Sequence, residues 1–122
     1  MIVKQVSVFV ENTVGRLADL TKILTDNNID LKASTIAETV DFGILRCIVE
    51  EPEKTVKILI ENGFSASISE VTGVSLEDKP GGLHKVLAVL AEAGIAVNYI
   101  YSTIKSAEGK AIIMMKTSDA AK

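Results

Sequence analysis

The chain of 122 residues repeats itself with a period of 66 residues, and this repeat constrains its fold more than any other feature. Several identical residues lie one period apart: Val8 and Val74, Glu11 and Glu77, Gly15 and Gly81, Leu17 and Leu83, Leu24 and Leu90, Ile29 and Ile95, and Gly43 and Gly109. The two copies align without a gap over about fifty residues, which indicates two copies of one supersecondary unit.

Hydrophobic periodicity predicts the order of elements in the first copy. Valines alternate with Ser7 and Phe9 over residues 6–10, which predicts a half-buried strand. Apolar residues then recur at helical spacing over 17–24, and strands are expected over 29–36 and 44–49. Pro52 suits the first turn of a second helix, and a last strand is expected over 64–69. The second copy repeats the pattern with a helix over 83–90 and strands over 95–104 and 110–115.

This βαββαβ order predicts an α+β fold, in which a four-stranded antiparallel sheet carries both helices on one face. Two such ferredoxin-like plaits in tandem are expected, one over residues 1–69 and one over 70–122. The second copy is incomplete at its C-terminus, because Lys122 corresponds to Val56 and counterparts of 57–69 are missing. Its first strand should therefore lack a neighbour, unless the chain stops short of its natural end or another chain covers that edge.

Composition excludes several classes of function. Thirteen basic and sixteen acidic residues give a net charge of −3, which argues against nucleic acid or an anionic membrane as partner. No targeting segment or membrane-spanning run is visible, so a cytoplasmic location is expected by elimination. With Cys47 as the single thiol and His84 as the single imidazole, we expect no disulfide framework, no catalytic residues, no metal site and no cofactor.

The loop that follows the first strand of each copy is the most informative segment. It reads Glu-Asn-Thr-Val-Gly-Arg-Leu over 11–17 and Glu-Asp-Lys-Pro-Gly-Gly-Leu over 77–83. Backbone N–H groups at the start of a helix attract a carboxylate or phosphate, and glycine lets a ligand approach closely. A helix cap with a tight turn explains the same residues equally well. The loop has neither the P-loop ending nor the dinucleotide fingerprint.

The second of these loops, followed after an amphipathic helix by Ala-Gly-Ile-Ala-Val-Asn over 93–98, resembles the ACT domain. The first copy keeps Asn12, Gly15 and Leu17 but has Val14 where proline is usual. The resemblance covers nearly the whole chain as a tandem pair. It implies a non-catalytic regulatory protein that binds a free amino acid where two ACT domains meet, usually along their second strands. We expect the two copies to join side by side through those strands.

The resemblance also implies which residues bind the ligand. The polar position of the loop falls on Asn12 and Asp78, and the polar position after the helix falls on Asp30. Ala96 replaces that aspartate in the second copy, so Asn98 is its substitute, and we expect one good site and one weak or absent site. The full set is Asn12, Val14, Gly15, Arg16, Leu17, Asp30, Asp78, Pro80, Gly81, Gly82, Leu83 and Asn98.

Charged residues of this set suit an amino acid, which offers an ammonium and a carboxylate. Asp30 or Asp78 would meet the ammonium, while loop N–H groups and Arg16 would meet the carboxylate. A solvated first-turn arginine and an exposed edge-strand aspartate are the simpler interpretations. Outside the set, Cys47 is expected in the core and His84 at the surface. Two tyrosines at 99 and 101 either pack locally or fill the space between the two copies.

Other proteins share the plait, so the fold alone does not decide the function. An RNA-binding module needs aromatic residues on its third strand, and residues 44–49 contain none. A metallochaperone needs paired cysteines, and an acylphosphatase-like loop is only weakly imitated by Arg16 and Asn12. We therefore expect a free amino acid as ligand, a homodimer, and an enzyme of amino-acid biosynthesis as a further partner. The alternative is an assembly module that binds an enzyme partner without a small-molecule ligand.

Overall fold

In the computed structural model, residues 1–11, 13–38, 42–103 and 109–117 are described. The elements are β1 (Ile2–Glu11), α1 (Arg16–Asp26), β2 (Ala33–Glu38), β3 (Phe42–Ile48), α2 (Pro52–Glu61), β4 (Ser65–Glu77), α3 (Gly82–Glu92), β5 (Val97–Ser102) and β6 (Lys110–Thr117). The strands are hydrogen-bonded in the order β2-β3-β1-β4-β6-β5. The predicted pair of ferredoxin-like plaits, an α+β fold, is confirmed.

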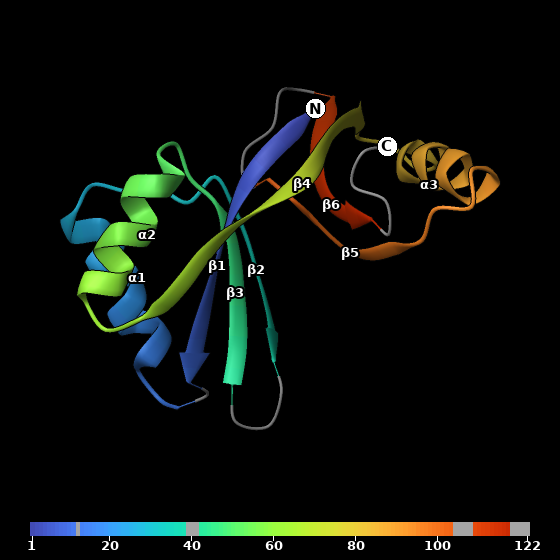
Figure 1. Cartoon of the computed structure of the whole chain (residues 1–122). Coiled ribbons are helices and arrows are strands. Elements are labelled where there is room, and N and C mark those ends of the chain that lie inside the picture. The colour runs from blue at the N-terminus through green and yellow to red at the C-terminus, as the bar shows by residue number, and fades with distance from the viewer. Residues whose placement is uncertain (12, 39–41, 104–108, 118–122) are drawn as a thin grey trace. The chain divides into compact units, whose positions relative to one another are not determined.

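The first compact unit comprises Lys4–Ser69. Figure 1 shows α1 and α2 together on one face of its strands. Alternate residues of β1 point to that face because side chains in a strand alternate in direction, and Val6 and Val8 are fully buried there. Leu20 of α1 and Leu59 of α2 are also fully buried and belong to the same hydrophobic core. The unit therefore contains a complete core between two helices and a sheet.

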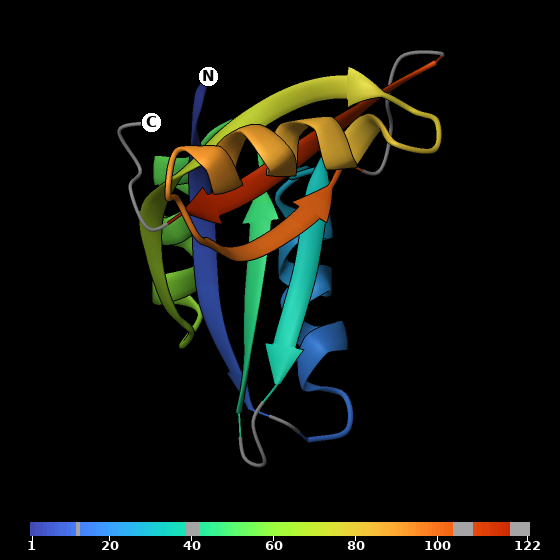
Figure 2. The same cartoon turned by 90° about the vertical axis from the view of Figure 1, so that its right-hand side faces the viewer.

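The second compact unit comprises Glu70–Lys122 together with Met1–Val3. Within it β6 pairs antiparallel with both β4 and β5, as Figure 2 allows the reader to follow. Its helix-side residues are less buried than their counterparts in the first unit. Leu20 and Leu24 are 0% and 2% exposed, whereas Val86 and Leu90 are only half-buried. Burial is lower because α3 is the only helix that the described part of this unit contains.

One strand, β4, belongs to both units. The sequence predicts a strand that ends at Ser69 and a new strand that begins the second copy, but β4 runs without interruption from Ser65 to Glu77. Its first residues complete the first unit and the others begin the second. The two copies of the repeat therefore share one continuous strand.

The expected unpaired edge of the second copy is occupied by the start of the same chain. The Met1 ammonium donates a hydrogen bond to the Gly73 carbonyl oxygen at 3.2 Å, and the Gly73 N–H donates to the Met1 carbonyl oxygen at 2.8 Å. The side chains of Met1 and Val3 lie over Gly73, where an added Cβ would come within 3.1 Å of Val3. No second chain is needed at this position.

The expectation that the two copies join through their second strands is wrong within the chain. The second strands are β2 and β5, and they lie at opposite ends of the strand order. β2 pairs with β3, and β5 pairs with β6. The continuity of β4 explains this result, because it keeps the first strands of the two copies at the centre of the order. The second strands then remain at its ends.

β2 begins four residues later than the predicted strand over 29–36. Residues 27–29 instead close helix α1: Asn28 adopts a positive φ of 57°, and the Ile29 N–H donates to the Leu24 carbonyl oxygen at 2.8 Å. Contact with β3 begins at Lys32, whose N–H donates to the Ile48 carbonyl oxygen at 2.9 Å. The sequence predicts that Asp30 is part of the strand. In the structure Asp30 instead lies in the connection before β2.

Candidate functional site

The two strand-to-helix loops have the same backbone geometry, one repeat apart. Gly15 and Gly81 adopt φ values of 86° and 87°, a left-handed conformation that glycine tolerates best. The N–H of Thr13 donates to the Glu11 carbonyl oxygen at 2.8 Å, and the N–H of Lys79, one repeat later, donates to that of Glu77 at 2.9 Å. The turn is thus a property of the repeat and not of one copy.

The helices that follow these loops begin without a side-chain cap from any described residue. The first N–H group of each helix is taken by the loop, because the Arg16 N–H donates to the Thr13 carbonyl oxygen at 3.3 Å and the Gly82 N–H donates to the Lys79 carbonyl oxygen at 3.0 Å. The next N–H groups have no partner within the helix, so a ligand or water can bind them. In the first unit Val14 is fully exposed and Leu17 is 41% exposed beside these groups. An anionic group could therefore reach the start of α1.

Arg16 has local partners that sequence reasoning did not anticipate. Its guanidinium lies 4.0 Å from the centre of the Phe64 ring, and its Nε lies 3.8 Å from Glu11 Oε1. A cation over an aromatic ring is stabilised by about 0.5–2 kcal/mol. This packing explains an arginine at a helix start, where the helix dipole favours anions. Arg16 is thus packed against Phe64 and Glu11 and is not the solvated arginine of the simpler interpretation, and its role as a carboxylate ligand stays a prediction.

The second loop carries a concentration of positive charge. Lys79 Nζ lies 2.6 Å from Glu77 Oε2, and this hydrogen bond, with Lys85 and Lys110 nearby, lowers the pKa of the Glu77 carboxyl. The Asp78 N–H donates to the Gly109 carbonyl oxygen at 3.0 Å, which ties the loop to the residues before β6. Asp78, Pro80 and Gly81 are exposed, Leu83 is half-buried and Gly82 is buried.

The predicted site residues do not converge within one chain. Asn12 lies outside the described residues. Asp30 and the loop before Arg16 lie at opposite ends of α1, an 11-residue helix that spans roughly 16 Å at 1.5 Å per residue. An amino-acid head group cannot bridge that distance. In the second unit Asn98 is an exposed residue of β5, and Ala96 precedes that strand.

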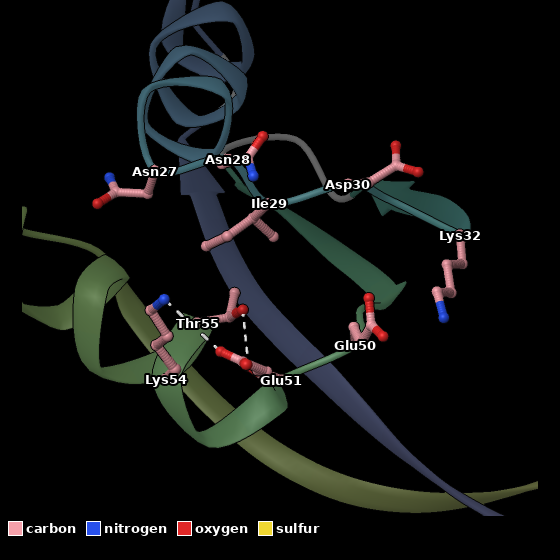
Figure 3. Close-up of a pocket in the computed structure, with 9 residues that line it drawn as sticks. All are labelled: Asn27, Asn28, Ile29, Asp30, Lys32, Glu50, Glu51, Lys54 and Thr55. Atoms are coloured by element: carbon pink, nitrogen blue, oxygen red, sulfur yellow. Dashed lines mark hydrogen bonds and ion pairs between the residues drawn. The ribbon is translucent and has the colours of Figure 1, made fainter.

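The structure also contains a pocket that the sequence did not predict. It encloses about 320 Å³ between the α1–β2 connection and the start of α2. Its lining residues, drawn in Figure 3, are Asn27, Asn28, Ile29, Asp30, Lys32, Glu50, Glu51, Lys54 and Thr55. Only Asp30 was among the predicted site residues. The others were missed because the two segments that meet here are about twenty residues apart, and neither contains a motif.

The remaining singled-out residues follow the simpler expectations. His84 is exposed on α3. The rings of Tyr99 and Tyr101 stack with centroids 6.5 Å apart, and Tyr101 is 8% exposed. Their role between the two copies stays a prediction. Among the described residues, no cluster of histidine, cysteine and carboxylate side chains could hold a metal ion. In the same part of the chain, no helix has the length and apolarity to cross a membrane.

Cys47 is expected to be chemically inert in the folded protein. Its side chain is 1% exposed in the core of the first unit, and burial raises the pKa of the thiol to about 12. Because the thiolate is the reactive form, alkylation by iodoacetamide near pH 8 should be roughly a thousandfold slower than in unfolded protein. Mass spectrometry of native and denatured samples measures this ratio. Equal rates would contradict the core assignment.

The comparisons with known proteins agree with this geometry. The family model of the ACT domain pair matches residues 1–122. A crystal structure of protein BT0572 from Bacteroides thetaiotaomicron is 42% identical and has a TM-score of 0.89, with 98% of this chain and 81% of that chain covered. No curated protein matches the chain.

More distant structures share the fold. The regulatory subunit of aspartate kinase from Thermus thermophilus, in a ligand-free form, has a TM-score of 0.70 at 14% identity and covers 92% of this chain and 81% of that chain. The corresponding subunit from Thermus flavus has a TM-score of 0.63 at 13% identity, with 92% and 80% covered. The repeat, the shared glycine turn and the family model that matches residues 1–122 lead to one conclusion: the chain belongs to the ACT domain pair family, a regulatory fold.

Proposed function

We propose that this protein is a non-catalytic regulatory protein that binds a free amino acid at an interface between ACT domains of two chains. One observation carries this proposal: the two halves of the predicted site, the loop before α1 and Asp30, lie at opposite ends of α1. A ligand that contacts both halves therefore requires a second copy of the first unit.

Pairing of β2 with β2 of a second chain would supply that arrangement. β2 is an end strand of the order, with β3 as its partner, so its other edge is available for pairing. In an antiparallel pair about a two-fold axis, the start of one β2 lies beside the end of the other. The end of β2, Glu38, pairs with Gly43, which in turn pairs with Val10 just before the loop. Asp30 of one chain would thus approach the loop of its partner.

The chemistry of this arrangement fits a zwitterion. The exposed Asp30 carboxylate would accept hydrogen bonds from the ammonium, and N–H groups at the start of α1 would bind the carboxylate. Because Arg16 already lies over Phe64 and near Glu11, the backbone carries the anion contact. The second loop would form a weaker site, since Ala96 replaces the aspartate there.

Replacing Asp30 by alanine should weaken binding at least tenfold, about 1.4 kcal/mol, because the ammonium loses a charged acceptor. Isothermal titration of the protein with each of the twenty amino acids identifies the ligand and measures the change; Asn12→Ala should have a similar effect. Asp26→Ala is the matched control, since Asp26 is an exposed aspartate on α1 that pairs with Lys22. Unchanged affinity in both site variants would reject the site assignment.

The other parts of the proposal concern partners and location. A homodimer follows from the ligand geometry, and an enzyme of amino-acid biosynthesis is the expected regulated partner. The protein itself would catalyse no reaction and would act in the cytoplasm. Sedimentation in the presence and absence of the identified amino acid tests the dimer directly, because a ligand that bridges two chains must stabilise their association.

The alternative function is an assembly module that binds an enzyme without a small molecule. Exposed aromatic residues on the sheet face opposite α1 and α2 favour it: Phe9 is 55% exposed and Phe42 is 51% exposed, on adjacent strands. Apolar surface of this kind marks protein interaction sites. This alternative requires that none of the twenty amino acids produces heat or a thermal shift, whereas the regulatory proposal requires that at least one does.

A further inference from the structure

We propose that the pocket in Figure 3 is a second ligand site, within one chain, for the head group of a small zwitterion such as a free amino acid. This proposal rests on the proposed function for the class of ligand, a free amino acid. It adds a second ligand molecule, which binds in this pocket and not at the interface between chains. All nine lining residues belong to the first unit, so the site needs neither a second chain nor the strand-to-helix loop. Its volume of about 320 Å³ lies at the lower end of the range for small-molecule sites.

Charges of both signs surround an apolar floor in this pocket. Ile29, which packs against the core, and Thr55, which is 1% exposed, lie at its centre in Figure 3. Lys32 and Glu50 lie on one side, and Lys54 lies on the other. The Lys54 ammonium suits a carboxylate on its side of the pocket, and the Glu50 carboxylate suits an ammonium on the other side. The Asp30 carboxylate points away from these groups, which leaves it to the interface between chains.

These charged groups have few partners in the folded chain. Lys54 Nζ lies 3.6 Å from Glu51 Oε2, an exposed pair of small energetic value. Lys32 and Glu50 form no side-chain hydrogen bond or ion pair with any residue that the structure describes. By contrast, the Thr55 hydroxyl is satisfied, because it donates to the Glu51 carbonyl oxygen at 2.9 Å. A ligand would therefore gain the charged groups without breaking a strong internal contact.

The internal repeat allows the residues that line the pocket to be compared with their counterparts in the second copy. The apolar floor is kept in the second copy, where Ile95 corresponds to Ile29, but the charged lining is not. The counterparts are Ala96 for Asp30, Asn98 for Lys32, Lys116 for Glu50 and Ala120 for Lys54. The described part of the second copy therefore contains neither these charges nor a counterpart of α2. Their presence in the first copy alone is consistent with a function specific to that copy.

Isothermal titration with the twenty amino acids, taken one at a time, tests the pocket by stoichiometry. The intact chain should bind one molecule in the pocket in addition to the interface ligand. Lys54→Gln and Glu50→Gln should each weaken the pocket event about tenfold and leave the interface event unchanged. Lys22→Gln is the control, since this exposed lysine lies on α1 outside the pocket. Circular dichroism of each variant confirms that it is folded.

The outcomes separate the two proposals. If Asp30→Ala removes the only binding event and both pocket variants bind normally, the pocket proposal is overturned and the interface site stands. If the pocket variants lose binding while Asp30→Ala keeps it, the pocket site stands and the interface site fails. If none of the twenty amino acids binds to the intact chain, both proposals fail.

Discussion

Gly82→Ala should destabilise the protein by about 3 kcal/mol, because an alanine methyl group has no room at this position. A Cβ on Gly82 would lie 2.1 Å from the carbonyl oxygen of Glu77, a backbone atom that cannot rotate away. The contact lies inside the turn that begins α3, so relief of the clash would open the whole loop. Urea unfolding followed by circular dichroism measures the change in the free energy of unfolding.

Gly81→Ala is the matched comparison for this prediction. Gly81 has no atom within 4 Å of an added Cβ, but its φ of 87° strains any other residue by roughly 1–2 kcal/mol. The two variants lie at adjacent positions but lose stability for different reasons, a steric clash at Gly82 and backbone strain at Gly81. If Gly82→Ala is no more destabilising than Gly81→Ala, the close approach of Gly82 to Glu77 is not present in solution.

Leu20→Ala should cost about 3 kcal/mol of stability, within the 2–5 kcal/mol typical of fully buried leucines. Leu20 is 0% exposed between α1 and the sheet of the first unit, so its truncation leaves a cavity in the core. Its counterpart one repeat later, Val86, is half-buried beside the single described helix of the second unit. Val86→Ala should therefore cost only about 1 kcal/mol.

The same urea measurement compares these two variants. If Leu20→Ala lowers the free energy of unfolding about three times as much as Val86→Ala, the first unit contains the main hydrophobic core of the chain. Equal losses for Leu20→Ala and Val86→Ala would instead mean that α3 is covered in solution to the same extent as α1. That result would contradict the difference in burial between the two units.

Local elements could be predicted from the sequence because their signals are local. Apolar spacing identified α1 and α2, and alternation identified β1, since helix and strand periods are 3.6 and 2. The glycine turns at Gly15 and Gly81 were also visible, because a positive φ selects glycine. The element least well predicted was β2, whose apolar Ile29 packs against the core from outside the strand.

The candidate site could be predicted only in part. Comparison of the copies singled out the loop residues and the resemblance to the ACT domain singled out Asp30, but neither could show that α1 separates them. Nor could it assign Arg16 to Phe64, because these residues lie far apart along the chain and meet only after α2 returns the chain to β4. The pocket could not be predicted either, because its lining residues come from two segments, 27–32 and 50–55, that meet only in the folded chain.

The sequence by itself determined the repeat, the order of helices and strands, and the fold of each unit. Only the tertiary structure decided how the copies share strands: β4 runs through both units, and Met1 pairs with Gly73 across 72 residues of chain. Strand pairing depends on backbone hydrogen bonds between distant segments, and the backbone is the same for every residue except proline. Side-chain patterns specify which face of a strand is buried and in which register it pairs, but which distant segment occupies a free edge depends on the folded chain as a whole.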